Sequence, residues 1–330
     1  MALLELKDVR TFFKTKRGTV KAVNGVSYSL DSGKVLGLVG ESGSGKSVSA
    51  MSVLRLLDEN GYIDSGDITF DGKDLIHLSK QDMYKIRGND ISVIFQEPMT
   101  SLNPVFTVEK QLCEPLMNHQ GMSKKEAKAK AIELLADVKI PNPDVVAKQY
   151  PHQLSGGMRQ RVMIAMALAC EPDVLIADEP TTALDVTIQA QILELMQKLQ
   201  KELDMGIIMI THDLGVVAQL CDRVIVMYAG TVCETGSVED IFYNPKHSYT
   251  KGLLRSVPKP DHQGKLEPIA GTPVDLLRLP PGCPFAPRCP DAMKICLRQR
   301  CEKILVRGEH RAACWNYVKA CRESGGENGK

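Results

Sequence analysis

The sequence predicts an α/β fold built around a parallel sheet, and three observations support that prediction. Apolar segments rich in β-branched residues alternate with segments of helical periodicity through the later part of the chain, which is typical of parallel sheets covered by helices. Residues 3–72 hold short strand-like segments broken by glycine-containing turns around one helix, which predicts an antiparallel β subdomain. Residues from about 97 to 169 are largely helical and predict a helical subdomain.

Local patterns predict the individual elements. Aliphatic runs too short for helices predict strands at residues 35–39, 91–96, 174–177 and 207–210. Helical periodicity predicts helices at residues 156–170 and 188–203. Another helix is expected through residues 124–138, because Ser123 and Glu126 stand at the spacing of a capping box at its start.

The last part of the chain differs from the rest in composition and in apolar periodicity. After Pro258 prolines become frequent and apolar periodicity fades, and six of the ten cysteines lie beyond residue 280. A stretch of this kind can hardly form a core of its own without a staple. We therefore expect one domain over residues 1–258 and a cysteine-rich extension over residues 259–330.

Charge and hydropathy exclude some classes of protein. With 41 basic and 40 acidic residues, the formal net charge of +1 gives no overall field that would attract nucleic acid, so we expect no nucleic-acid partner. The apolar run at residues 162–170 is far shorter than the ~20 residues of a membrane-spanning helix, and acids in the first ten residues argue against a signal peptide. We expect a soluble, cytoplasmic chain whose cysteines are reduced or bind metal.

The strongest motif is GESGSGKS at residues 40–47, which matches GxxxxGK[ST] between an apolar strand and a helix. Its glycines allow backbone N–H groups to face phosphate oxygens, and the helix that begins there adds its positive end. Lys46 supplies a cation, and Ser47 offers a hydroxyl to Mg²⁺. By itself the loop predicts an NTPase. The phosphate-binding residues that it predicts are Gly40, Ser42, Gly43, Ser44, Gly45, Lys46 and Ser47.

Two adjacent acids end the apolar strand in VLIADEP. Asp178 suits Mg²⁺, and Glu179 suits a water molecule. An isolated pair of acids at a strand end would ordinarily be a solvated turn. The apolar strand before them and the phosphate loop elsewhere in the chain favour a catalytic role instead.

The sequence LSGGMRQR at residues 154–161 resembles the signature motif of the ABC ATPases, and the order of motifs along the chain matches that family. The resemblance implies a P-loop ABC cassette with a RecA-like core, an antiparallel β subdomain and a helical subdomain. It also implies that Ser155, Gly156 and Gly157 reach across a head-to-tail dimer to the γ-phosphate held by the other subunit. ATP and Mg²⁺ are the cofactors that it implies.

The same resemblance assigns roles to further positions. Glu179 would be the general base, and His212, in ITHD, would contact the γ-phosphate. Gln96 would touch Mg²⁺ and water and would sense the membrane subunit, Asp178 would bind Mg²⁺, and Asp185 would lie in the D-loop of residues 183–185.

The family stacks an aromatic ring on adenine near the end of the first strand. The spacing from Val9 assigns that role to Phe13, and Phe12 next to it is the alternative.

The segment NPKHSYTKGLL at residues 244–254 resembles the stretch that follows the cassette in the peptide and nickel importers, with Ser248 where proline is common. This implies the D-type ATPase subunit of a dipeptide or oligopeptide importer. The partners it implies are a second, unequal ATPase subunit, two transmembrane permease subunits and, indirectly, a peptide-binding protein. The chain would then lie at the cytoplasmic face of the membrane. Nickel, glutathione or an antimicrobial peptide as cargo, a homodimer, and a non-transport ABC ATPase remain alternatives.

The cysteines of the extension fit the iron–sulfur tail of that subfamily. The resemblance implies a [4Fe–4S] cluster held by Cys283, Cys289, Cys296 and Cys314. A structural zinc site and unligated thiols are the alternatives, and Cys301 and Cys321 are alternatives for the fourth ligand. Whether such a cluster would be structural or redox-sensing stays open.

Overall fold

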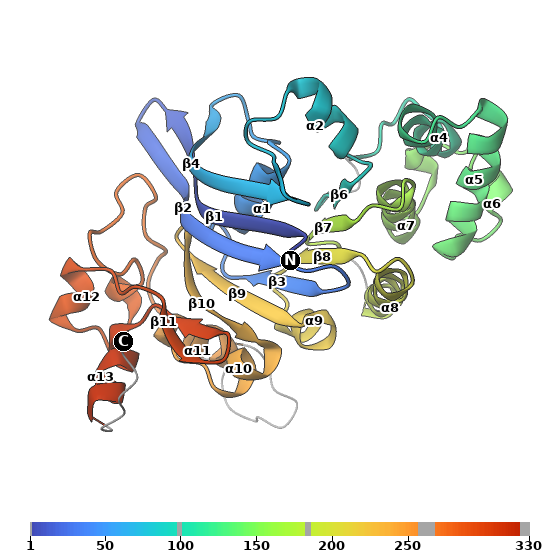
Figure 1. Ribbon diagram of the computed structural model, residues 1–330. Helices are drawn as coiled ribbons and strands as arrows, with labels where there is room; N and C mark the ends of the chain where they lie inside the picture. Colours follow the sequence, from blue (N-terminus) through green and yellow to red (C-terminus); the bar gives the residue numbers. More distant parts are fainter. Residues whose placement is uncertain (1, 98–100, 182–185, 257–267, 324–330) are drawn as a thin grey trace. The chain divides into compact units, whose positions relative to one another are not determined.

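The computed structural model describes residues 2–97, 101–181, 186–256 and 268–323 (Figure 1). Compactness divides the chain into two units, each interleaved along the sequence. Unit one comprises Met1–Leu3, Leu30–Val35 and His77–Ile210, and unit two comprises Leu4–Ser29, Leu36–Ile76 and Thr211–Lys330.

Unit one contains three parallel strands, β6 (Ile91–Ile94), β7 (Val174–Asp178) and β8 (Gly206–Ile210). β7 lies in the middle, with Val174 opposite both Ile91 and Gly206. Its five residues are all buried, as expected of a parallel strand covered on both faces. The helices α2 (Lys80–Ile86) and α8 (Val186–Glu202) belong to the same unit.

The remainder of unit one is helical, with α4 (Val108–His119), α5 (Lys124–Asp137), α6 (Pro143–Val146) and α7 (Gly156–Leu168) packed on one another (Figure 1). The capping box at the start of α5 is present: the Ser123 N–H donates to Glu126 Oε2 at 2.8 Å, and the Glu126 N–H donates to Ser123 Oγ at 3.4 Å. The short 3₁₀ turn η1 (Pro151–Gln153) leads into α7.

Unit two begins with an antiparallel sheet in the order β2 (Gly18–Leu30), β1 (Leu4–Thr15), β4 (Gly61–Phe70) and β5 (Lys73–Asp74). The register of β1 against β4 shifts between Lys7 and Thr11. Asp8 has a φ of +47° there, and Gly66 approaches so closely that an added Cβ would lie 2.6 Å from the Asp8 carbonyl oxygen. The bulge therefore requires glycine at position 66.

A second group of strands in unit two runs in the order β11 (Ile304–Arg307), β12 (His310–Ala312), β10 (Thr231–Ser237), β9 (Arg223–Tyr228) and β3 (Val35–Val39). β3 pairs with β9 in parallel, and the other pairs are antiparallel. The C-terminal hairpin thus continues the cassette's own strands, with Glu234 opposite Ala312. The helices α1 (Lys46–Val53), α9 (Leu214–Leu220), α10 (Val238–Tyr243) and α11 (Ser248–Arg255) complete this part.

Besides that hairpin, the described residues of the C-terminal extension form the small elements η2 (Ala286–Arg288), α12 (Lys294–Arg298) and α13 (Trp315–Glu323). Its Phe285 is buried against Tyr228 and Tyr249, with ring centroids 5.3 and 5.2 Å away. These rings belong to an apolar cluster with residues of β3 and β9. The extension is therefore stabilised by sharing a core with the cassette.

Candidate nucleotide site

The phosphate loop lies in unit two, between β3 and α1. All five residues of β3 are buried, and the loop then takes backbone angles that favour glycine: φ is +150° at Gly40, +74° at Gly43 and +97° at Gly45. A Cβ at Gly40 would lie 2.2 Å from the Met227 carbonyl oxygen, and one at Gly45 would lie 2.3 Å from that of Ala22. The loop can keep this path only with glycine at both positions.

Lys46 is the first residue of α1 and is only 6% exposed. Its ammonium group donates to the carbonyl oxygens of Gly40 at 2.8 Å and Glu41 at 3.0 Å, so its cation lies against the loop. The N-cap residue Gly45 makes no side-chain cap hydrogen bond to α1, and a helix N-terminus of this kind suits an anion. Buried Ser44 and half-buried Ser47 flank this point.

The residues predicted to stack on adenine and to contact the γ-phosphate, Phe13 and His212, also belong to unit two. Phe13 is half-buried in β1, opposite Gly61, where an added Cβ would lie 2.7 Å from the Phe13 ring. Its neighbour Phe12 is buried and makes an edge contact with Tyr62 at 6.2 Å. His212 is exposed, directly before α9, whose N-cap Asp213 accepts the Gly215 N–H at 2.8 Å.

Unit one brings three predicted residues together. Asp178 ends β7 and is 8% exposed, and Glu179 follows with a φ of +47°, an angle that non-glycine residues adopt mainly where surrounding structure enforces it. The Glu179 N–H donates to the Ile210 carbonyl at 2.9 Å and holds that turn. The Gln96 amide, two residues after β6, donates to Glu179 Oε2 at 3.0 Å. The amide thus orients the carboxylate predicted to act on water.

The signature residues of unit one lie at the start of α7. Ser155 is the N-cap, and its hydroxyl accepts the Met158 N–H at 3.3 Å. Ser155 and Gly156 are exposed, and an added Cβ at Gly156 would meet nothing within 4 Å. Gly157 is closer to α8, because its Cβ would lie 3.2 Å from Ile188. An open helix N-terminus of this kind suits an anion. Residues 183–185, including the predicted D-loop Asp185, lie outside the described residues.

Comparisons with known proteins agree with this set of motifs. Residues 23–182 match the family model described as "ABC transporter", and residues 233–296 match that described as "Oligopeptide/dipeptide transporter, C-terminal region". The dipeptide transport ATP-binding protein DppD of Bacillus subtilis is 55% identical over 315 residues, which cover 95% of this chain and 94% of that protein. This chain belongs to the ATP-binding subunits of peptide ABC transporters.

Other members and a solved structure extend the comparison. The oligopeptide transport ATP-binding protein OppD of Escherichia coli is 55% identical over 296 residues, covering 89% of this chain and 88% of that one. The dimeric post-hydrolysis structure of the ATP-binding cassette MJ0796 with ADP and Pi has a TM-score of 0.65 and 30% identity, covering 71% of this chain and 98% of its own. As an ABC ATPase, the chain uses ATP and Mg²⁺ and hydrolyses ATP to power transport.

The predicted iron–sulfur cluster is wrong. Cys283, Cys289, Cys296 and Cys314 do line one cavity, but its volume is about 20 Å³, room for about one water molecule. Burial raises the pKa of the Cys283 thiol to about 11 and also raises that of Cys289. Among the residues that the structure describes, no group of three or more potential ligands is arranged to hold a metal ion.

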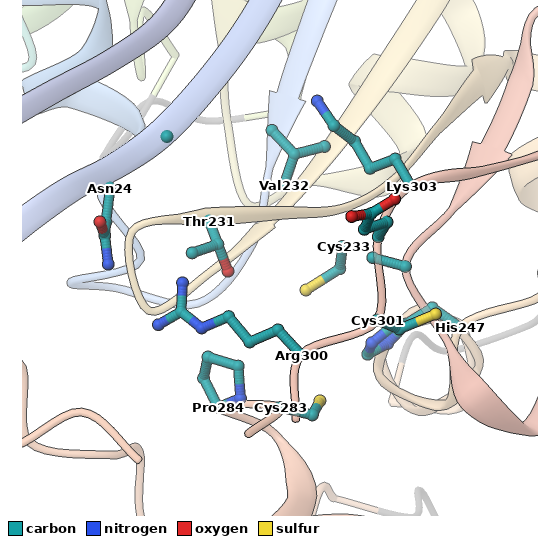
Figure 2. A pocket seen from close by; sticks show the side chains of 13 residues that line it. Asn24, Thr231, Val232, Cys233, His247, Cys283, Pro284, Arg300, Cys301 and Lys303 are labelled. Atoms are coloured by element: carbon teal, nitrogen blue, oxygen red, sulfur yellow. The ribbon is translucent and has the colours of Figure 1, made fainter. Parts of the chain in front are cut away.

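Neighbouring cysteines do not form an alternative centre. Cys233, Cys283 and Cys301 come from three separate segments around a larger cavity of about 290 Å³, which Arg300 and Lys303 also line (Figure 2). Burial raises the pKa of Cys301 to about 12 and raises that of Cys233. All three thiols are free of disulfide bonds in the structure.

Within the described ranges, none of the helices combines the length and the apolar character that crossing a bilayer requires.

Proposed function

We propose that the chain powers the import of dipeptides or oligopeptides, as the ATPase subunit of a transporter whose membrane part is made by other chains. The observation that supports this most strongly is the loop of residues 40–47. Its backbone leaves no room for a Cβ at Gly40 or Gly45, and the Lys46 ammonium donates to the Gly40 carbonyl. Cargo and assembly come from the relatives, whose names describe dipeptide and oligopeptide transport.

The proposed roles of the residues follow their chemistry. Gly40, Ser42, Gly43, Ser44 and Gly45 surround the phosphates with backbone N–H groups. Lys46 exchanges its two loop carbonyls for phosphate oxygens, and Phe13 stacks on the adenine ring.

The magnesium and hydrolysis roles belong to polar side chains. Ser47, Gln96 and Asp178 are the proposed ligands of Mg²⁺, which when bound neutralises charge on the phosphates. Glu179 accepts a proton from the attacking water and is oriented by Gln96, while His212 contacts the γ-phosphate.

Ser155, Gly156 and Gly157 bind the γ-phosphate held by a second cassette, with Asp185 nearby in that assembly. The exposed start of α7 supports this role, because Ser155 and Gly156 are exposed at a helix N-terminus, which suits an anion. We propose an unequal ATPase as the partner cassette and two permease subunits as the membrane part. The chain would bind them at the cytoplasmic face and would respond indirectly to a peptide-binding protein outside.

Peptide uptake tests this function. The transporter would be reconstituted in vesicles with ATP inside, and uptake of a labelled dipeptide and a labelled hexapeptide would be measured for wild type and for Lys46→Ala. Uptake by wild type that Lys46→Ala abolishes is the expected result. Uptake of nickel or glutathione in place of either peptide would contradict the proposed cargo.

A further inference from the structure

The C-terminal extension contacts Glu41 of the phosphate loop. Glu41 stands second in GESGSGKS, between Gly40 and Ser42, and the nucleotide roles above do not use its side chain. The Arg288 guanidinium, from η2 of the extension, forms a forked ion pair with its carboxylate: Nη1 donates to Oε2 at 2.6 Å and Nη2 donates to Oε1 at 2.9 Å. The Arg288 side chain is 5% exposed and that of Glu41 is 27% exposed.

Three further hydrogen bonds hold the Arg288 guanidinium in place. Its Nε donates to the Ala270 carbonyl at 2.9 Å, Nη2 donates to the Ile269 carbonyl at 3.2 Å, and Nη1 donates to the Tyr228 hydroxyl at 3.3 Å. With the two bonds to Glu41, these contacts use all five N–H donors of the guanidinium. The fork is therefore fixed in orientation, which favours a bidentate bond with a carboxylate.

The other two polar groups of Glu41 are also bound. Its N–H donates to the hydroxyl of buried Tyr249 at 2.8 Å, and its carbonyl accepts the Lys46 ammonium at 3.0 Å. Tyr249 packs against Tyr228 and Phe285, the aromatic cluster that the extension shares with the cassette. The side chain of Glu41 thus binds the extension, its amide binds α11 of the cassette, and its carbonyl binds the Lys46 ammonium.

We propose that Arg288 and Tyr249 are positioning residues of the nucleotide site, which hold the phosphate loop through Glu41 in the shape that binds ATP. A loop fixed in advance needs no ordering when nucleotide arrives, so the contacts raise affinity. The residues that act on water, Glu179 and Gln96, lie in unit one and are not part of this network. The extension then sets the KM for ATP and leaves the chemical step unchanged. This inference rests on the proposed nucleotide site.

The test is steady-state ATPase kinetics of the assembled transporter with full-length subunits. Arg288→Lys keeps the charge but cannot bridge both carboxylate oxygens while also reaching the carbonyls. It should raise the KM for ATP about tenfold and change kcat at saturating ATP by less than about twofold. Glu41→Gln should do the same, and the double variant should be no worse than either single one, because the pair acts as a unit. Arg298→Lys, at the exposed end of α12, is the matched control and should match wild type.

A milder variant covers the case in which Arg288→Lys fails to fold. Tyr249→Phe removes only the hydroxyl that accepts the Glu41 N–H and should raise KM about threefold with kcat unchanged. An unchanged KM in the folded variants, a fall in kcat without a rise in KM, or effects that multiply in the double variant would each overturn the inference. A wild type without ATPase activity would instead overturn the proposed function.

Discussion

Glu179 is the residue that we propose as the general base for hydrolysis. Its backbone is held at a positive φ by the bond to Ile210, and its carboxylate is held by Gln96, so both ends of the residue are fixed. Restraint of this kind is typical of a group that must meet water in one orientation. The adjacent Asp178 differs, because it is 8% exposed at the end of a buried strand.

Replacing Glu179 by Gln should separate binding from hydrolysis. The amide keeps the shape and the contact with Gln96 but cannot accept a proton, so kcat should fall by about 10²- to 10³-fold. The affinity for ATP, measured by titration with a fluorescent analogue, should stay within about threefold of wild type. Glu194→Gln, on the exposed face of α8, is the control and should hydrolyse ATP normally. Equal losses of affinity and turnover would contradict a catalytic role.

At the scale of elements, local motifs were predictable and long-range pairing was not. The phosphate loop and the capping box at Ser123 each lie within a few residues, so their spacing predicts their geometry. The pairing of Glu234 with Ala312, and the cluster of Tyr228, Tyr249 and Phe285, join residues far apart in sequence. No local pattern contains that information, and for this reason the proline-rich tail looked as if it had no core.

The cysteine error has a related cause. Spacing orders the thiols along the chain but says nothing of the space between them, which decides whether a cluster fits. The link from Arg288 to Glu41 was missed for the same reason, since 247 positions separate the two residues.

The loop glycines provide an element-scale prediction. Gly45→Ala combines a strained φ of +97° with a Cβ 2.3 Å from the Ala22 carbonyl oxygen, whereas Gly72→Ala has a similar strain at +72° but open space around it. Gly72→Ala should therefore lower the free energy of unfolding by about 1 kcal/mol. Gly45→Ala should lower it by at least about 2 kcal/mol more. Urea denaturation of the two variants side by side measures the difference, and equal costs would show that the close approach is wrong.

The N-cap of α11 predicts a pH dependence. His247 is buried, and its Nδ1 accepts the Tyr249 N–H at 3.1 Å. Burial lowers the pKa of His247 to about 4, Glu234 opposes this shift, and Lys251 adds to it. Because the folded pKa lies below the unfolded value of about 6.5, the contribution to stability is full above pH 6.5 and is lost as pH falls toward 4.

Between pH 7 and pH 5 the loss from His247 should be about 2 kcal/mol in the free energy of unfolding. His247→Asn keeps a capping acceptor without a titrating ring, so its stability should depend less on pH by that amount. The exposed His152 supplies the control, since His152→Asn should keep the wild-type slope. A slope unchanged in His247→Asn would contradict the assignment of the acid sensitivity to His247.

At the scale of the whole molecule, the chain is the ATPase subunit of a transporter. Its C-terminal extension belongs to the same unit as the phosphate loop. The hairpin β11–β12 continues the strands of unit two, and Arg288 reaches the phosphate loop of the same unit. Tail and cassette should therefore unfold together.

Peptide-stimulated ATPase activity tests the central claim most directly. The wild-type chain would be assayed alone, with its membrane partners in vesicles, and with those partners plus a peptide-loaded binding protein. The account predicts that ATP hydrolysis rises severalfold when the loaded binding protein is added and that it does not respond to peptide when the membrane partners are left out. Robust hydrolysis that is indifferent to both partners and peptide would contradict it and would indicate an ABC ATPase that does not serve transport.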